Sequence, residues 1–175
     1  MITKLRIGTL LALFFLSVTV ACIQYNVNTS PEAFPFPSES TFEIEEGVDL
    51  SIYNAYIEYE KVEILPNSGV TGMPKQYTET IIAAAERELM KKGLQISPSA
   101  SKSITLKVVD PICKQLMMIT CQLSLEVELG SGDRFIIDVV NSTGGNIWRA
   151  INGATHKASV SLLQDDRLAA YLRNN

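Results

Sequence analysis

Apolar and polar residues alternate over two neighbouring stretches of the chain, residues 122–129 and 133–140, which are separated by Gly130-Ser131-Gly132. The apolar positions are Leu123, Leu125, Val127, Phe135, Ile137 and Val139. A period of two is typical of strands with one buried face, and directly opposed residues of a hairpin share a face. Pairing Leu129 with Asp133 places these apolar residues opposite one another in three pairs: Val127 with Phe135, Leu125 with Ile137, and Leu123 with Val139. We therefore predict a β-hairpin in this register, with Gly132 in a left-handed turn position.

Three further stretches have the composition or the alternation of strands. Residues 43–65 are rich in Ile, Val and Tyr, and shifts of phase within them predict a break near residues 53–56. Residues 104–109 alternate until Asp110-Pro111, where we expect the strand to stop. Residues 147–151 follow a turn-forming stretch and predict another strand. Residues 66–72 are predicted to form a loop.

Helical periodicity is present in two regions. Residues 73–93 carry one apolar stripe at helical spacing, and Gly93 followed by Leu94 predicts a left-handed C-terminal cap. Residues 153–172 also indicate a helix, which is interrupted at residues 164–166. The order of elements favours an α+β fold, in which a largely antiparallel sheet has two helices packed on one face.

The first 22 residues have the layout of a secretory signal peptide. Lys4 and Arg6 precede an uncharged apolar run, Ile7 to Ala21, that ends in small residues. An uncleaved transmembrane helix is the alternative, but a bilayer crossing needs about 20 apolar residues, and this run gives out at Gln24. We therefore interpret residues 1–21 as a cleaved signal peptide.

The end of this segment, Thr19-Val20-Ala21-Cys22, resembles the lipobox of bacterial lipoproteins. The resemblance implies that Cys22 is lipidated, with palmitate among the expected acyl groups, and becomes the first residue of the mature chain. In such signals an Asp after the cysteine favours retention in the inner membrane. Ile23 follows Cys22 here, which implies a lipid anchor in the outer membrane and a protein that faces the periplasm.

The region after Cys22 is rich in proline. Residues 22–41 contain Pro31, Pro35 and Pro37 among polar residues and predict a lipidated, flexible tether, so that residues 42–175 form a single domain.

The chain has 15 Lys plus Arg and 19 Asp plus Glu. Loss of the two signal-peptide bases leaves a net charge of about −6, which argues against a nucleic-acid partner. Nine acids between residues 23 and 74 predict repulsion from anionic headgroups, or simply a solubilising surface.

Cys113 and Cys121 remain once Cys22 is assigned to the lipid. Export to an oxidising compartment predicts a disulfide between them, whereas two cysteines and a single histidine do not make an ordinary zinc site. If the two cysteines lie directly opposite each other, apolar positions of one strand meet polar positions of the other. A bulge at Asp110-Pro111 would shift the register and restore the match. With the bulge, the clamped loop presents three apolar residues as a predicted partner-binding surface: Leu116, Met117 and Met118.

Few residues offer catalytic chemistry. His156, Ser159 and Asp165 do not follow the spacing of a known triad, and Glu126 with Glu128 fits the alternation of a solvated strand face. The sequence has no dinucleotide-binding fingerprint, phosphate-binding loop or metal-ligand spacing. We therefore predict no catalytic residue, metal or cofactor.

Four features together resemble small proteobacterial outer-membrane lipoproteins of the YajG type. They are Cys22 in the lipobox, the helix ending at residues 89–94, the hairpin, and the C-terminal residues 162–172. The resemblance implies a periplasm-facing envelope protein. Two functions remain open: a non-enzymatic accessory or stabilising factor for an envelope complex, or an enzyme or ligand-binding protein that acts on cell-wall or lipid components.

Overall fold

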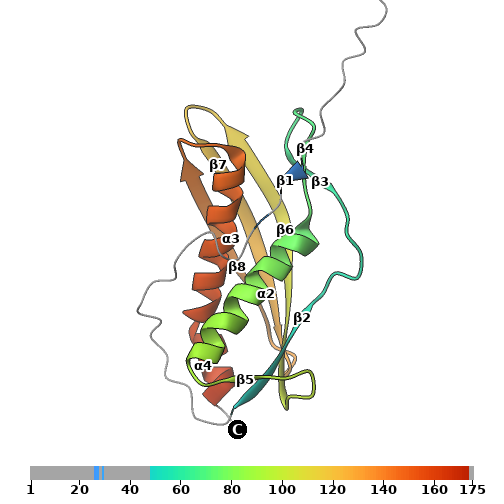
Figure 1. The fold of residues 1–175 in the computed structure, drawn as a ribbon, viewed down its shortest axis with the longest axis vertical. Helices are drawn as coiled ribbons and strands as arrows, with labels where there is room; N and C mark the ends of the chain where they lie inside the picture. Colours follow the sequence, from blue (N-terminus) through green and yellow to red (C-terminus); the bar gives the residue numbers. More distant parts are fainter. Residues whose placement is uncertain (1–25, 28, 30–47, 174–175) are drawn as a thin grey trace, which may run out of the picture.

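The computed structural model describes residues 26–27, 29 and 48–173. The predicted signal peptide, Cys22 and most of the predicted tether lie outside these residues, and so does the start of the predicted domain at residue 42. Helices and strands form two layers, with the helices in front of the main sheet in the view of Figure 1.

The main sheet is mixed, whereas the sequence predicts a largely antiparallel one. Its strand order is β5-β2-β6-β7-β8. The strands β6, β7 and β8 are antiparallel, but β2 is parallel to both of its neighbours, β5 and β6. A parallel pair requires a long crossover connection, and the chain between β2 and β6 contains a helix that supplies it. The bounds are Asp49–Asn54 for β2, Gln95–Ile96 for β5, Lys102–Gln115 for β6, Ile119–Leu129 for β7 and Arg134–Thr143 for β8.

A second, three-stranded sheet has the order β1-β4-β3. It consists of β1 at Asn26–Val27, β3 at Val62–Leu65 and β4 at Val70–Gly72. β4 occupies part of the predicted loop, and β1 occupies part of the predicted tether. β1 precedes the first proline of that tether, so the composition that resists regular structure begins only after it. β1 pairs with β4 in parallel, whereas β3 pairs with β4 antiparallel.

Three helices are present in the described part of the chain, one more than predicted. They are α2 at Pro74–Lys91, α3 at Ile147–Leu163 and α4 at Asp166–Arg173. The predicted interruption at residues 164–166 is confirmed, since it separates α3 from α4. α2 and α3 contact each other and the same face of the main sheet, and α4 packs against α3.

The predicted strand at residues 147–151 is wrong, because α3 begins there. The side chain of Asn146 accepts a hydrogen bond from the backbone N–H of Arg149 at 3.0 Å. This N-cap contact satisfies one of the free N–H groups of the first helical turn. Capping and burial of Ala150 and Ile151 against the sheet outweigh the strand preference of this β-branched and aromatic stretch.

The C-terminus of α2 ends as the sequence predicts. The N–H of Leu94 donates to the carbonyl of Leu89 at 3.2 Å, and the N–H of Gly93 donates to that of Met90 at 3.0 Å. These two bonds form a Schellman motif, in which Gly93 has a φ of 92°. Leu89 and Leu94 are both buried, so the cap also closes one end of the core.

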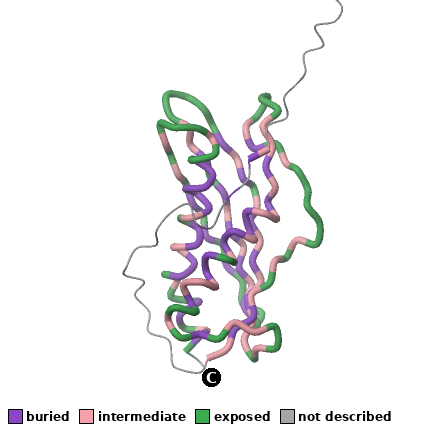
Figure 2. Tube along the Cα trace, viewed as in Figure 1, coloured by how far each residue is buried: buried purple, intermediate pink, exposed green. Residues whose placement is uncertain are grey.

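The core lies between the helices and the inward face of the main sheet. Figure 2 shows the buried residues along this interface and the exposed residues at the hairpin ends. In the β6–β8 part of the sheet, the buried side chains alternate along each strand: Ile104, Leu106, Val108, Leu123, Leu125, Val127, Phe135, Ile137 and Val139. The predicted strand character of Ile57 and Tyr59 is wrong, because both lie in the irregular connection between β2 and β3, where they are exposed.

The register of the β7–β8 hairpin is confirmed. Val127 lies opposite Phe135, and Glu128 lies opposite Arg134. The N–H of Leu129 donates to the backbone carbonyl of Asp133 at 2.9 Å, and the N–H of Gly132 donates to the backbone carbonyl of Leu129 at 2.8 Å. Gly132 takes a φ of 93°, the left-handed conformation that closes this three-residue turn.

We expect Gly132→Val to lower the free energy of unfolding by about 1–2 kcal/mol, because a β-branched residue is strained at positive φ. No atom lies within 4 Å of a Cβ placed at Gly132, so the loss comes from the backbone alone. Ser131→Val, one residue earlier in the same exposed turn, is the matched control and should change stability little. Urea unfolding of both variants measures the difference, and equal midpoints would contradict the turn geometry.

Candidate functional site

The shape of β6 is decided by a bulge in its middle. The register with β7 shifts between Val109 and Ile112, and Asp110 has a φ of 51°. The alternation predicts that the strand stops at Asp110-Pro111. This prediction is wrong, because β6 continues to Gln115. The bulge itself was predicted, and it changes the phase of the strand so that the residues beyond it keep their buried face towards the helices.

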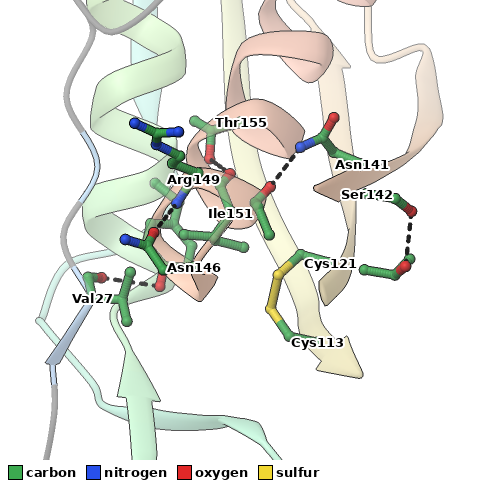
Figure 3. Close-up of a disulfide and its surroundings, with 12 residues drawn as sticks. Val27, Cys113, Cys121, Asn141, Ser142, Asn146, Arg149, Ile151 and Thr155 are labelled. Atoms are coloured by element: carbon green, nitrogen blue, oxygen red, sulfur yellow. Dashed lines mark hydrogen bonds between the residues drawn. A yellow bond between two sulfur atoms is a disulfide. The ribbon is translucent and has the colours of Figure 1, made fainter. Parts of the chain in front are cut away.

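Cys113 and Cys121 lie directly opposite each other and form a disulfide, as predicted. Both are completely buried, because the inward face of the hairpin is covered here by the first turns of α3. Figure 3 shows the disulfide beside Ile151 of α3, together with Asn141, whose side-chain amide donates to the carbonyl of Ala150 at 3.1 Å.

Beyond the disulfide the two strands continue for two more residue pairs and end in a three-residue hairpin tip, Leu116–Met118. Leu116 is 89% exposed, Met117 100% and Met118 49%. The N–H of Leu116 donates to the carbonyl of Met118 at 3.1 Å and closes the turn. The predicted surface residues are therefore adjacent and exposed, on a hairpin that a covalent bond holds closed.

The last residues of β8 and the start of α3 lie at the same end of the molecule as the hairpin tip (Figure 1). Ile119 pairs with Thr143, and the hydroxyls of Thr120 and Ser142 lie 2.7 Å apart, so β8 supports the base of the tip. Trp148, in the first turn of α3, is 37% exposed. Its place at this end follows from the helix start at Ile147. The capping residue Asn146 is the sequence signal for that start, although the residues after it have the composition of a strand.

The other candidate chemistry lies on the open face of the sheet. A shallow hollow of about 580 Å³ is lined by residues of β6, β7 and β8, including Glu126 and Glu128. Each of these carboxylates has a basic partner across the sheet: Glu126 lies 3.9 Å from Lys107, and Glu128 lies 3.0 Å from Arg134. They therefore act as cross-strand ion pairs on a solvated face, as the alternation indicates.

His156, Ser159 and Asp165 make separate contacts. Ser159 donates its hydroxyl hydrogen to the carbonyl of Thr155 at 3.1 Å, inside α3. Asp165 binds the guanidinium of Arg167 at 2.7 Å, which holds the pKa of this carboxyl below its usual value. Partial burial lowers the pKa of His156, and the positive charge of Arg87 lowers it further. Within the described residues, no group of three or more His, Cys, Asp or Glu is placed to hold a metal ion.

No helix among the residues that the structure describes is long and apolar enough to cross a membrane.

Comparisons with known proteins identify a shared fold. No protein-family profile matches the sequence. No curated protein sequence matches it either. A Xanthomonas campestris protein of the DUF330 family has a TM-score of 0.50 and 12% identity, over 85% of this chain and 93% of that one. A minor lipoprotein of Acinetobacter baumannii has a TM-score of 0.37 and 12% identity, over 66% of this chain and 91% of that one. At such identity the first likeness shows the α+β fold, and the YajG-type resemblance stays a prediction.

Replacement of both cysteines, Cys113→Ala with Cys121→Ala, should lower the free energy of unfolding by about 2.5 kcal/mol in the chain-entropy model. The bond closes a loop with a sequence separation of 8, and in this entropy model its removal stabilises the unfolded chain by giving it more conformational entropy. Urea unfolding under non-reducing conditions measures the loss. Thiol labelling of the unfolded, unreduced wild type is the control, and reaction at either cysteine would contradict the disulfide.

Proposed function

We propose that this protein is a lipoprotein anchored in the outer membrane through Cys22, that it faces the periplasm, and that it acts as a non-enzymatic accessory or stabilising factor for an envelope complex. The lipobox supports the anchor. The free edge of β8 supports a binding role.

β8 forms one edge of the main sheet, and no other strand of the described chain pairs with its outer side. Because Leu129 and Asp133 form a hydrogen-bonded pair, the alternation of an antiparallel ladder directs the backbone groups of the even-numbered residues of β8 away from β7. The carbonyl of Val140 is one of these groups, and it accepts a hydrogen bond from Lys157 at 2.9 Å. The strand is ten residues long, so the described part of the chain leaves most of the edge open to a partner.

A long open edge is a surface that binds extended chains. Backbone hydrogen bonds add a strand to the sheet, and side chains on alternate positions provide specificity. Ile136 and Val140 project from this edge onto the open face, where they are 56% and 53% exposed. An apolar surface next to free backbone donors and acceptors suits a protein partner, which is the observation that carries the proposed role.

The anchor is tested by Cys22→Ser. We expect this change to abolish incorporation of labelled palmitate and to remove the protein from the outer-membrane fraction, because the serine hydroxyl does not replace the thiol that carries the lipid. The wild-type chain, expressed and fractionated in parallel, is the control. A Cys22→Ser protein that stays firmly in the outer membrane would contradict the anchor.

The binding role is tested with a photo-crosslinking residue at Ile136 on β8, in the lipidated protein within its native envelope. A crosslinker at Ala83, an exposed position on α2, is the matched control. We expect a discrete adduct from position 136 and none from position 83. The same adducts from both positions, or none from position 136, would contradict binding at the edge.

A further inference from the structure

The link between Cys22 and the domain is shorter than the predicted tether, because β1 is docked on the domain. Val27 is completely buried, and its carbonyl accepts a hydrogen bond from the hydroxyl of Tyr77 at 3.1 Å. That hydroxyl reaches β1 across Gly72, where a Cβ would lie 1.9 Å from it. Further along, the hydroxyls of Thr29 and Thr80 lie 2.6 Å apart in a buried contact. These contacts fix Asn26, Val27 and Thr29 to α2 and β4.

The distance between the lipid and the domain is therefore limited by covalent geometry. Four residue steps separate Cys22 from Asn26, and a fully extended chain of that length spans at most about 14 Å. The strand β6, with 14 residues, is about 46 Å long. A lipid on Cys22 is consequently confined to the end of the molecule at which Asn26 lies, and it cannot reach the other end.

Strand direction identifies that end. β1 is parallel to β4, with Asn26 opposite Thr71, so the chain enters β1 from the side of the turn at residues 66–69. Figure 1 places this turn, the hairpin tip and the start of α3 at the same end of the long axis. β3 also contacts β6, whose last residues lead into the tip.

The chemistry of this end matches the surface of a membrane. The hairpin tip presents three consecutive exposed apolar side chains. Lys114, two residues before the tip, and Arg149, in the first turn of α3, are also exposed. No acidic residue is present in residues 111–125 or 139–150, so the tip and the connection from β8 to α3 are positively charged. The acidic side chain of Glu63 in the nearby β3–β4 hairpin accepts hydrogen bonds from the backbone N–H groups of Ser68 and Gly69.

We infer that the hairpin tip, Leu116–Met118, inserts into the same membrane leaflet that holds the lipid on Cys22, and that it fixes the orientation of the domain on the membrane. The apolar side chains enter the acyl region, while Lys114 and Arg149 lie at the level of the anionic headgroups. The inference rests on the proposed lipid anchor. It replaces the expectation that the whole body is held away from the membrane.

The sequence alone suggested a protein partner for the tip. Three observations favour lipid instead: the reach of the anchor, the location of the tip at the anchored end, and the positive charge around it. A short anchor also raises the effective concentration of the tip at the membrane surface, so that a small apolar contact is sufficient for insertion.

The test uses the mature lipidated protein in protein-free vesicles of phosphatidylethanolamine and phosphatidylglycerol, part of which carry brominated acyl chains. Trp148→Phe removes the single tryptophan of the chain. Met117→Trp then places a fluorophore in the tip, and Met90→Trp places one at the C-terminal end of α2, where Met90 is 59% exposed. Both sites are exposed, so the two substitutions leave the core unchanged, and Met118→Trp serves as a second probe of the tip.

Bromine quenching should be several-fold stronger for Met117→Trp than for Met90→Trp, because only the tip reaches the acyl chains. Protein that floats with the vesicles but shows equal quenching at the two positions, or none, overturns the insertion and leaves the lipid anchor standing. An unquenched tip in these vesicles is also the result expected if the tip serves a protein partner. A mature protein without an acyl group on Cys22 overturns both the insertion and the proposed anchor.

Discussion

The bulge at Asp110-Pro111 is the constraint on which this molecule depends most. Side chains of a strand alternate with a period of two, so the residues on the two sides of the bulge face the helices only if one position is added between them. Val108 lies opposite Leu125, and Cys113 lies opposite Cys121, because the register shifts between these pairs. Without the shift, one end of β6 would turn its polar side to α2 and α3, and Cys113 would no longer lie opposite Cys121.

The same feature connects the core to the candidate site. The buried disulfide is covered by α3, and the hairpin continues past it into solvent as two residue pairs and the tip. The tip is thus an apolar element carried by a rigid strand pair, rather than the end of a free loop. Rigidity reduces the conformational entropy that an exposed segment loses when it inserts or binds.

The open face of the main sheet and its outer edge at β8 have different roles. The open face carries cross-strand ion pairs, such as the one between Glu128 and Arg134, which keep it solvated and contribute little to stability. The outer edge at β8 keeps its backbone groups available. The proposed protein contact at this edge and the proposed membrane contact at the tip use different parts of the hairpins, so one molecule can make both at once.

Local sequence determined the features that depend on neighbours in the chain. The β7–β8 register, the left-handed Gly132 and the end of α2 at Gly93 were predicted, because alternation and turn chemistry act over a few residues. The disulfide and the bulge were predicted because two cysteines must meet and the faces must match. The exposure of Leu116–Met118 also follows from these constraints.

Tertiary structure decided what depends on distant segments. Residues 147–151 have strand composition but form the first turn of α3, because the cap at Asn146 and burial of Ile151 on the sheet favour a helix there. β2 is parallel to β6 because α2 crosses between them, which alternation within β2 does not reveal. Asn26–Val27 is too short to indicate a strand, and contacts with distant residues, such as those of β4 and the hydroxyl of Tyr77, hold it in place. Sequence therefore predicted an anchor and a tip, and the fold places β1, which begins four residues after Cys22, at the same end of the molecule as the tip.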